Sequence, residues 1–273
     1  KNIWVLTQMG PCVYDHNLLK IKNLCLDPDY KSLFKNLLLP RKITVGKDSI
    51  VWIVSSYYLH RIDLKLKKRK DYKFQGDEYL VNILRFKEDI YIASSKYLYK
   101  VNQLNEPERI LFNLGEHMTD NQSLAGFIAF GEKFLFVIQG KGFVVYDPVK
   151  QTVEKFIRNK WNIPDQDFQG VAMNVIKNKL WFCVPNYGLH IYDFITGETE
   201  VYKANNYDPY ALKNNILQEI FEDKNGQIWL SVYKKGINYI DINYNQFSSF
   251  YNIPNDPSSL PSSNVVSFFE DNE

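Results

Sequence analysis

The stretch NNILQEIFEDKNGQIWLSVYKKGINYID, residues 214–241, decides the fold of this chain. Apolar and polar residues alternate on both sides of an Asp-Lys-Asn-Gly turn, and one Trp follows that turn. A period of two is typical of β-strands, because successive side chains of a strand point to opposite faces of a sheet. The stretch therefore predicts a β-hairpin, either an isolated one or one copy of a repeat.

The spacing of three residues in this stretch recurs along the chain. Trp229 is followed after seven residues by Gly236 and after twelve residues by Asp241. Two further copies keep both offsets, and three more appear when the loop is shortened by one residue. The six copies are anchored at Trp4, Trp52, Tyr91, Leu135, Trp181 and Trp229.

The period of these anchors is that of a propeller blade. Successive anchors lie 39 to 48 residues apart, which matches the period of about 40 to 50 residues of β-propeller repeats. Each copy is rich in β-branched and aromatic residues, and a further apolar stretch follows its last Asp or Asn, so we expect four strands per copy. In the quoted copy and its continuation these strands, a to d, are residues 217–223, 228–231, 236–241 and 247–251.

The two ends of the chain predict a closed ring. Residues 265–271, VVSFFED, repeat strand a but stop before a Trp, whereas the chain begins just before Trp4. Joined end to start, the step from Asp271 to Trp4 is six residues, equal to the step from Asp223 to Trp229. Pairing the last strand a with the first strands would remove the open sheet edges of the ring.

We therefore predict an all-β fold with one domain over residues 1–273, a β-propeller of about six four-stranded blades closed by residues 265–273. Part of a seven-bladed propeller is the alternative. A longer repeat array cut at equivalent points would also give the same spacing.

Composition indicates a globular fold but excludes few classes of function. With 45% hydrophobic and 23% charged residues, the chain can bury a sizeable core. Its 33 basic and 31 acidic residues give a net charge of +2, which favours neither a nucleic-acid nor a membrane-surface partner. No run of 18 apolar residues and no signal-peptide pattern is present, so we expect any such segment of a parent protein to lie outside this chain. The three cysteines are too few for a disulfide framework or a zinc site, although a bridge between Cys12 and Cys25 stays open.

Residues 206–271 carry a specific motif. It runs as Asp-Pro-x-x-Leu-x-x-Asn, an apolar strand, Glu-Asp, a Gly turn, an apolar residue with Trp, a short loop, Gly with an apolar residue, and a final Asp. The chain fills these positions with Asp208, Pro209, Leu212, Asn215, Glu222, Asp223, Gly226, Trp229, Gly236 and Asp241. In this region the chain resembles the two-component regulator propeller repeat. The likeness decays toward the N-terminus, where the third copy lacks the Glu-Asp turn, the Trp and the Gly.

This resemblance implies a sensor. Proteins with such repeats are typically the periplasmic sensor regions of hybrid two-component systems of gut Bacteroidetes, and they usually detect oligosaccharides released from glycans. The resemblance therefore implies a periplasmic ligand-sensing domain that works as a homodimer. It also implies that the membrane helix and the histidine kinase lie elsewhere in the parent protein. The near-neutral charge argues against a nucleic-acid partner of this chain, and we expect no cofactor.

Catalytic and metal-binding signatures are weak. The chain has no Gly-x-Ser-x-Gly, His-Glu-x-x-His or Gly-x-x-x-x-Gly-Lys motif. Residues 165–170, DQDFQG, match the start of an EF-hand loop, but Ile176 stands where a calcium-binding Glu is required. The histidines are far apart in sequence, so we expect packing roles rather than metal ligation for His16, His60, His117 and His190.

Residues that recur in every copy are better explained by blade architecture than by function. We expect each Trp to pack between sheets and each Glu-Asp-x-x-Gly run to form the a-to-b turn, where Asp accepts backbone hydrogen bonds and Gly adopts positive φ. Function is then expected among residues that differ between copies. In a propeller, strand a lines the central channel, and the d-to-a and b-to-c loops meet at one mouth of it.

The loops at that mouth contain the candidate ligand-binding residues. Tyrosine and tryptophan rings can pack on the C–H face of a pyranose, while amides and lysines can bind hydroxyls or carboxylates. The several lysines suggest an acidic saccharide. The candidates are Tyr57, Tyr58, Lys96, Tyr97, Lys141, Trp161, Asn162, Gln169, Asn186, Tyr187, Tyr233 and Lys234, with His117 as a further loop residue.

Two other classes of function remain open. A propeller-fold glycan lyase or hydrolase would need two carboxylates or a Tyr-His pair at the mouth, and His117 near Glu116 and Asp120 is the local hint. A protein-interaction scaffold would instead present a flat apolar face. The basic run LKLKKRKDYK, residues 64–73, could bind an anionic polymer, but an outer strand d whose lysines protect an exposed edge is the preferred interpretation.

Overall fold

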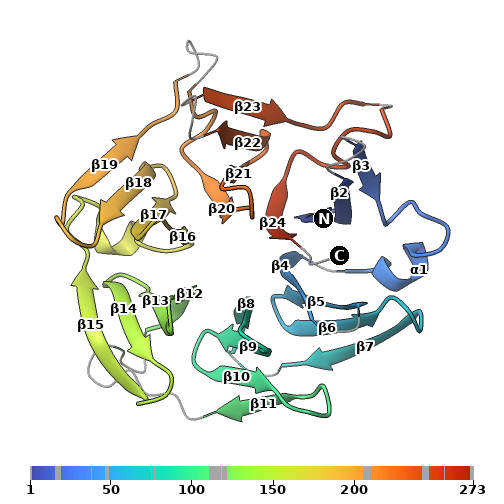
Figure 1. The fold of residues 1–273 in the computed structure, drawn as a ribbon, viewed down its shortest axis with the longest axis horizontal. Helices are drawn as coiled ribbons and strands as arrows, with labels where there is room; N and C mark the ends of the chain where they lie inside the picture. The colour runs from blue at the N-terminus through green and yellow to red at the C-terminus, as the bar shows by residue number, and fades with distance from the viewer. Residues whose placement is uncertain are drawn as a thin grey trace.

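The computed structural model describes residues 2–15, 20–37, 39–46, 49–74, 76, 78–110, 118, 122–205, 211–241, 246–254 and 256–270. Over these residues the chain forms six four-stranded antiparallel sheets around one central axis (Figure 1). This is a six-bladed β-propeller, so the predicted fold class is confirmed. We number the blades 1 to 6 in the order of their anchors, and strand a of each blade lies nearest the axis.

The strands have the following bounds. Blade 1 consists of β24 (Val265–Glu270), β1 (Asn2–Thr7), β2 (Gly10–Asp15) and β3 (Lys20–Asn23). Blade 2 consists of β4 (Pro40–Val45), β5 (Ile50–Ser55), β6 (Tyr58–Asp63) and β7 (Lys68–Lys73). Blade 3 consists of β8 (Leu80–Phe86), β9 (Asp89–Ser94), β10 (Leu98–Val101) and β11 (Pro107–Ile110).

The second half of the ring repeats this order. Blade 4 consists of β12 (Leu124–Phe130), β13 (Lys133–Ile138), β14 (Gly142–Asp147) and β15 (Thr152–Arg158). Blade 5 consists of β16 (Ala172–Ile176), β17 (Lys179–Val184), β18 (Gly188–Asp193) and β19 (Thr199–Tyr202). Blade 6 consists of β20 (Leu217–Glu222), β21 (Ile228–Val232), β22 (Gly236–Asp241) and β23 (Gln246–Phe250).

Short helical segments lie in two of the connections between blades. The one-turn helix α1 (Lys31–Phe34) lies between blades 1 and 2, and a 3₁₀ turn (Asp165–Asp167) lies between blades 4 and 5. Within the described ranges, neither these segments nor any other helix has the length and apolar character needed to span a bilayer.

The ring closes through its first blade. Strand β24 pairs antiparallel with β1, with Phe269 opposite Trp4 and Phe268 opposite Val5. The red C-terminal strand therefore lies beside the blue N-terminal strands in Figure 1. This pairing confirms the predicted closure and gives β1 a partner on its inner side, so blade 1 has four strands like the other blades.

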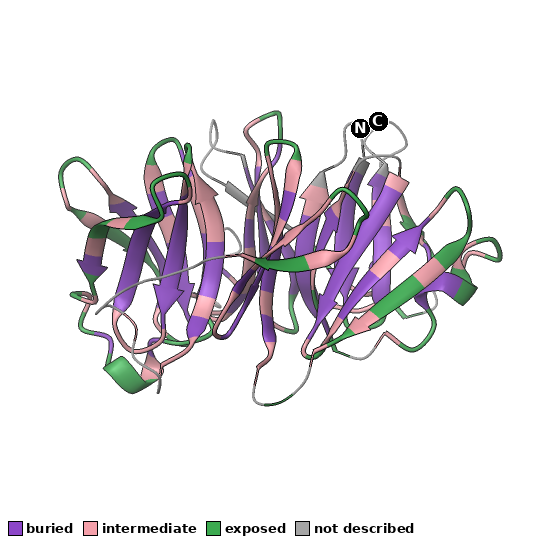
Figure 2. Ribbon diagram, turned by 90° about the horizontal axis from the view of Figure 1, so that it is seen from below, coloured by how far each residue is buried: buried purple, intermediate pink, exposed green. Residues whose placement is uncertain are grey.

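The anchor residues pack one blade against the next. Trp52 is almost completely buried and belongs to one apolar cluster with Ile83 and Ile92 of blade 3. Trp229 lies against Tyr14 of blade 1, with ring centroids 5.7 Å apart. Figure 2 shows how burial is distributed over the described residues. The inner and middle strands are mostly buried, and exposed residues lie mainly in the outer strands and loops. The expectation that the recurring tryptophans serve blade packing is thus confirmed at these positions.

The recurring Gly of strand c has a steric cause. Gly236 has φ of 82°, and a Cβ placed there would collide with the carbonyl oxygen of Phe250 on the neighbouring strand β23. Any L-residue with a side chain would be strained by this φ and would also meet that carbonyl. The glycine therefore lets strand d approach the start of strand c.

The turns between strands c and d also follow the repeat. The Asp147 Oδ1 atom accepts hydrogen bonds from the backbone N–H groups of Val149 and Lys150. The Asp193 Oδ1 atom accepts the equivalent bonds from Ile195 and Thr196. These N–H donors hold the pKa of both carboxyl groups below the usual Asp value. The last Asp of the motif is therefore a turn residue in these two blades.

The basic run and the cysteines have structural roles in blades 1, 2 and 5. The basic run 64–73 contributes β7, the outer strand of blade 2, as predicted. Cys12, Cys25 and Cys183 are all free thiols, so the bridge considered between the first two is not formed. Burial raises the pKa of Cys25 to about 11 and that of Cys183 to about 12, which makes both thiols poor nucleophiles.

Candidate functional site

A cavity lies on the propeller axis, at the mouth where the inner strands begin. Its volume is about 360 Å³, and its walls come from the first residues of all six inner strands. The b-to-c loops of blades 5 and 6 add Pro185 and Tyr233. This is the mouth at which propeller geometry places the d-to-a and b-to-c loops. We call it the channel cavity.

A β-bulge near the start of the inner strand shapes this cavity in five blades. In β4, for example, Pro40 pairs with Ser55 and Lys42 pairs with Val54, so Arg41 is an extra residue without a partner on β5. A bulge bends its strand and can turn a side chain away from the ladder. All five extra residues line the channel cavity, namely Arg41, Val81, Ala125, Gln218 and Val266.

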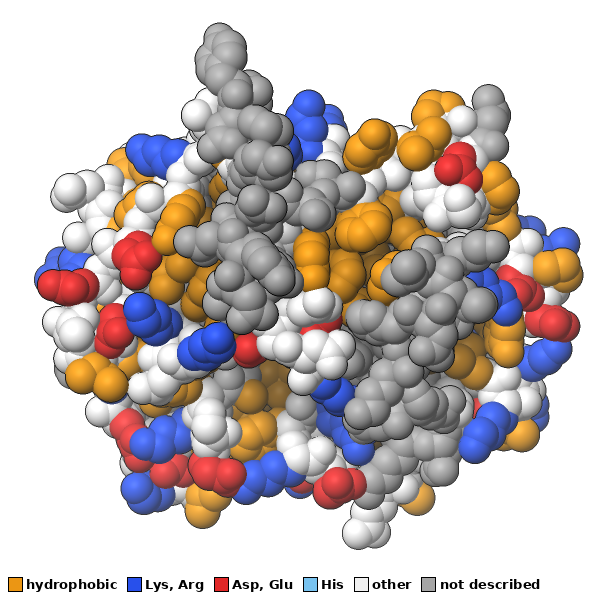
Figure 3. Space-filling model, turned by 45° about the horizontal axis from the view of Figure 1, so that its top comes forward, with side chains coloured by type: hydrophobic (Ala, Val, Ile, Leu, Met, Phe, Trp, Pro, Cys, Tyr) orange, Lys and Arg blue, Asp and Glu red, His pale blue; other side chains and the backbone are white. Residues whose placement is uncertain are grey.

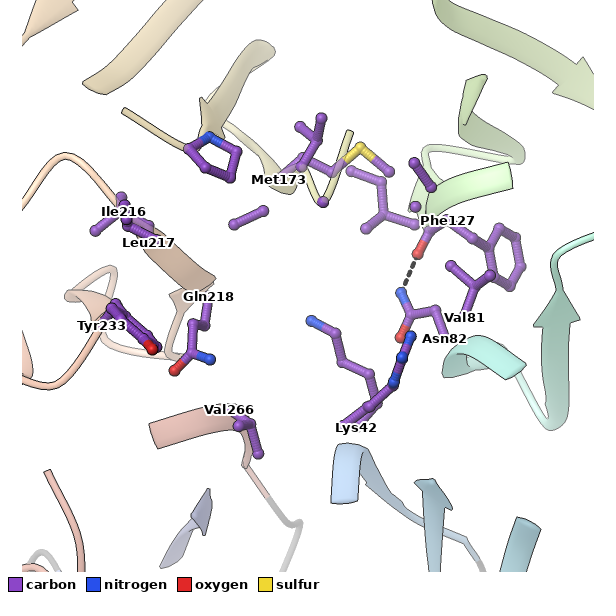
Figure 4. A pocket seen from close by; sticks show the side chains of 18 of the residues that line it. Lys42, Val81, Asn82, Phe127, Met173, Ile216, Leu217, Gln218, Tyr233 and Val266 are labelled. Atoms are coloured by element: carbon purple, nitrogen blue, oxygen red, sulfur yellow. Dashed lines mark hydrogen bonds between the residues drawn. The ribbon is translucent and has the colours of Figure 1, made fainter. Parts of the chain in front are cut away.

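The channel cavity combines an apolar wall with a few polar groups. Figure 4 shows Lys42 reaching toward the middle of the cavity, with Gln218 and Tyr233 to one side and Asn82 and Phe127 to the other. The amide of Asn82 is already engaged, because its Nδ2 donates to the Phe127 carbonyl and its Oδ1 accepts from the Ile83 N–H. Asn82 therefore ties blade 3 to blade 4.

Gln218 offers an acceptor to the cavity. Its Oε1 atom is buried and has no hydrogen-bond partner among the described residues. A buried acceptor without a partner is costly, and such atoms are commonly satisfied by water or by a ligand. The bulge thus brings Gln218, whose buried Oε1 has no partner among the described residues, to the side of the cavity where Tyr233 lies (Figure 4).

Lys42 is the most perturbed charged group of the cavity. Its ammonium forms an ion pair with the Glu219 carboxylate, and the two side chains are 20% and 14% exposed. Burial lowers the pKa of Lys42 to about 7, because removing the ammonium from water disfavours its charged form. Arg41 provides a second cation, with its guanidinium carbon 5.8 Å from the ring centroid of Tyr79.

Tyr233 is the one predicted site residue found among the residues that line the channel cavity. Its backbone N–H donates to the Ile216 carbonyl at 3.0 Å, which holds the b-to-c loop of blade 6 against the start of β20. The Lys234 ammonium lies 5.1 Å from the Tyr233 ring centroid and is exposed. These two candidates are therefore neighbours at the cavity mouth.

Three other candidates come together between blades 4 and 5. The Trp161 ring packs against Phe143 and Phe182, and its Nε1 donates to Thr199 Oγ1 at 2.9 Å. The Tyr187 hydroxyl donates to Asp167 Oδ2 at 2.6 Å, and this bond raises the pKa of Tyr187. Gln169 accepts a hydrogen bond from the Gln139 amide at 2.7 Å. Trp161 is thus mainly a packing residue, whereas Gln169 is exposed.

The remaining candidates lie on these loops and on the loops of other blades. The Tyr58 ring stacks on His60, and the Arg109 guanidinium lies 3.4 Å from the ring centroid of Tyr97. Tyr57 is exposed, and so are Asn162 and Asn186, which both adopt left-handed backbone conformations. These seven candidates do not line the cavity: Tyr57, Tyr58, Lys96, Tyr97, Lys141, Asn162 and Asn186. His117, with Glu116 and Asp120, lies outside the described residues.

The comparisons with known proteins concern the fold. No protein-family model matches the chain, and no curated protein matches it. Among solved structures, the extracellular domain of a Bacteroides thetaiotaomicron protein described as a one-component system has a TM-score of 0.60 and 17% identity, over 84% of this chain and 30% of that chain. The extracellular domain of a hybrid two-component system from the same organism has a TM-score of 0.54 and 16% identity, over 79% of this chain and 31% of that one.

The chain has the fold of these extracellular domains. It spans about 30% of the length of these two proteins' chains. A protein of unknown function from Bacteroides caccae is similar over nearly its whole length, with a TM-score of 0.63 and 9% identity, covering 98% of this chain and 97% of that one. At such identities the likeness concerns the propeller itself and not its site residues.

Sequence reasoning missed the charged residues of the cavity. The repeat pattern assigns strand a a structural role and favours the loops as the place of binding, whereas Arg41, Lys42 and Gln218 lie within inner strands. A signal was available in residues 40–45, PRKITV, where two adjacent cations stand in a segment that the repeat makes an inner strand. Charged residues are rare in such positions unless they are paired or functional.

Blade 2 also contains a Ser-His-Asp chain, the arrangement of many hydrolases. Ser55 Oγ lies 2.9 Å from His60 Nε2, and His60 Nδ1 lies 2.8 Å from Asp71 Oδ1. However, Ser55 is only 1% exposed and His60 only 3%, so a substrate cannot reach the hydroxyl in this conformation. Arg69 also binds the Asp71 carboxylate through two nitrogens, at 2.7 and 2.9 Å. The hydrogen bonds of Ser55, His60 and Asp71 therefore connect strands b, c and d of the blade.

Proposed function

We propose that this propeller is the ligand-sensing domain of a two-component signalling protein and that it binds an oligosaccharide in the channel cavity. The observation that carries the proposal is the cavity itself. It lies at one mouth of the channel, and the extra residues of β-bulges in five blades line it. The likeness to extracellular domains of such systems supports the signalling context. We further propose a periplasmic location and a homodimer, with the kinase and the membrane helix on other parts of the parent protein.

The chemistry of the cavity fits a sugar. A pyranose has apolar C–H faces and a rim of hydroxyl groups that donate and accept hydrogen bonds. In the proposed complex its apolar face packs on the Tyr233 ring, while one hydroxyl donates to the buried Oε1 of Gln218. Apart from Arg41, Lys42 and Asn82, the other side chains of the described wall are apolar, and a low-polarity surrounding strengthens the few polar contacts.

The size of the cavity bears on how much of the ligand it can hold. About 360 Å³ is near the lower end of the range of small-molecule sites, which is roughly 300 to 1,000 Å³. We therefore place one end of the oligosaccharide in the cavity and its next units over the loops of the mouth. The exposed candidates Tyr57, Asn162, Gln169, Asn186 and Lys234 are proposed as contacts for those units.

Signalling requires more than binding. A ligand shifts an equilibrium only if it binds one arrangement of the protein more tightly than another. The inner strands of different blades converge on the cavity, so a ligand there contacts several blades at once. We propose that this cross-blade contact favours one relative arrangement of the two protomers.

A panel of oligosaccharides tests the proposal. Binding is measured by calorimetry, and every sugar that binds is incubated with the protein and analysed for products. Binding without turnover is the expected result. Product formation would point instead to a glycan lyase or hydrolase, and the absence of binding across acidic, neutral and sulfated sugars would overturn the proposal.

A further inference from the structure

The charges that line the channel cavity are of one sign. Of the described residues in its wall, Arg41 and Lys42 are cationic and none is a carboxylate. By contrast, Lys and Arg side chains are interspersed with Asp and Glu over the described part of the face shown in Figure 3. Cations in a partly apolar recess attract an anion more strongly than the same cations on an open surface.

The Lys42–Glu219 pair holds two blades that are not neighbours. Lys42 belongs to β4 of blade 2 and Glu219 to β20 of blade 6. Strand β24 of blade 1 lies between these two strands in the ring (Figure 1). The hydrogen bonds of Asn82 and Asn174 differ, because each joins the inner strands of adjacent blades. The ion pair therefore spans the blade in which the ring closes.

The Lys42 ammonium can be shared or exchanged between two anions. An ammonium has three donors, and it reaches into the cavity while Glu219 itself is not part of the cavity wall. An anion that entered the cavity would meet Lys42 together with Arg41. The anion would have two cationic partners, whereas Glu219 forms an ion pair with Lys42 alone of the two.

We propose that Arg41 and Lys42 form an anion subsite in the wall of the channel cavity, that the ligand is an oligosaccharide bearing a carboxylate or sulfate group, and that Glu219 competes with this group for Lys42. The inference rests on the proposed function, since it names the class of oligosaccharide that the same cavity binds. Ligand entry weakens the tie between blades 2 and 6, so binding of the anion is coupled to the packing around blade 1.

The proposal makes predictions of opposite sign for the two members of the ion pair. Replacing Lys42 removes a cation that binds the ligand, so affinity for an anionic sugar falls. Replacing Glu219 by Gln removes the competing carboxylate, so affinity for the same sugar rises. A residue that only supported the fold would lower the affinity in both cases.

Three glucopyranoses that differ only at C6 provide the probes: glucose, glucuronate and glucose 6-sulfate. Their binding to the intact chain is measured by calorimetry at pH 6.5 in low salt. We expect at least one of the two anionic sugars to bind ten times or more as tightly as glucose, and the stronger of the two identifies the carboxylate or the sulfate as the preferred group. Lys42→Gln should remove at least a tenfold share of this preference, Arg41→Gln should reduce it, and Glu219→Gln should increase affinity for the anionic sugar severalfold.

Two further variants control for folding and for general electrostatics. Lys42→Gln leaves a buried carboxylate unpaired, which is destabilising, so the double variant Lys42→Gln/Glu219→Gln is measured as well; it removes both charges and should show no preference for anions. Lys87→Gln/Glu132→Gln removes an exposed ion pair between blades 3 and 4 and should change nothing.

Equal binding of all three sugars would overturn this inference, as would lack of binding by both anionic sugars or reduced anion affinity in Glu219→Gln. The proposed function would survive the first two results if neutral oligosaccharides bound in the panel described above. It would fail separately if no saccharide bound there.

Discussion

The indole Nε1 of Trp229 donates a hydrogen bond to Oδ2 of Asp223, 2.9 Å away, and both side chains are buried. The other carboxylate oxygen of Asp223 accepts the backbone N–H groups of Asn225 and Gln227, at 2.9 and 3.0 Å. Gly226 completes this turn with φ of 78°. One carboxylate thus joins the a-to-b turn of blade 6 to the ring that packs this blade against blade 1.

Replacement of Asp223 by Ala should lower the free energy of unfolding by about 2–3 kcal/mol, because it leaves two backbone donors and the buried indole N–H without their acceptor. Urea denaturation followed by tryptophan fluorescence measures this change. Asp29→Ala, at a well-exposed carboxylate, is the control and should change stability by less than about 0.5 kcal/mol. Equal effects of the two substitutions would contradict the role of Asp223.

Ring closure can be tested at Phe268, which is buried on β24 and packs near Phe221 of blade 6. Phe268→Ala should cost about 3–5 kcal/mol, the usual range for removing a buried phenylalanine ring. Phe250 lies on the outer strand β23 and is 36% exposed, so Phe250→Ala should cost distinctly less. Denaturant midpoints of both variants provide the measurement, and a larger loss for Phe250→Ala would argue against closure through β24.

Stability should decrease as the pH falls below about 6.5, the ordinary value for histidine. Burial lowers the pKa of His60 and of His190 in the folded protein. Asp71 opposes the shift at His60, and Arg69 adds to it. Between the lowered pKa and the ordinary pKa, the unfolded chain therefore binds more protons than the folded chain. The free energy of unfolding is then highest above the ordinary histidine pKa and decreases as the pH falls below it.

Urea midpoints at pH 5.5, 6.5 and 7.5 measure this dependence. The His60→Gln/His190→Gln variant should show a flatter profile over the same interval, because it lacks both groups. A profile as steep as that of the unmodified chain would show that other groups cause the pH dependence.

Affinity for glucuronate should fall as the pH rises above about 7. The anion binds the charged form of Lys42, and burial lowers the pKa of that group to about 7. Among the described residues, the charged groups near it are Arg41, which lines the same cavity from the same strand, and the Glu219 carboxylate on β20, with which it pairs. Calorimetry between pH 6 and 9 measures the effect, and in Lys42→Gln the dependence should disappear. An unchanged affinity at pH 9 would exclude Lys42 as the titrating anchor.

Tyr233 should contribute to binding of any saccharide, charged or neutral. Tyr233→Ala removes the aromatic face in the cavity wall and should weaken binding about tenfold, equivalent to about 1.4 kcal/mol. Tyr202→Ala is the matched control, because Tyr202 lies exposed on the outer strand β19. Calorimetry with a sugar that binds in the oligosaccharide panel compares the two, and equal losses would remove Tyr233 from the site.

The turn and packing residues were accessible from sequence because their effects are local or repeated. Asp223, Gly226 and Trp229 lie within seven residues of one another, so the turn that they build depends on short-range hydrogen bonds and backbone conformation. The closing strand was predictable for the same reason, since β24 carries the alternation of β20. The site was less accessible, because the loops that sequence reasoning favoured place only Tyr233 of its candidates in the cavity wall.

The order of strands, their number per blade and the closure of the ring are determined by the sequence itself, through a period of two within strands and a period of 39 to 48 residues between anchors. Only the tertiary structure decided that Arg41, Lys42 and Gln218 share one cavity and that Glu219 pairs with Lys42. These residues come from strands in blades 2 and 6, far apart along the chain. In both strands a bulge of one residue shifts the pairing register and so changes which side chain faces the axis. The hydrophobic pattern of the sequence predicts the strands but does not reveal the position of such a bulge.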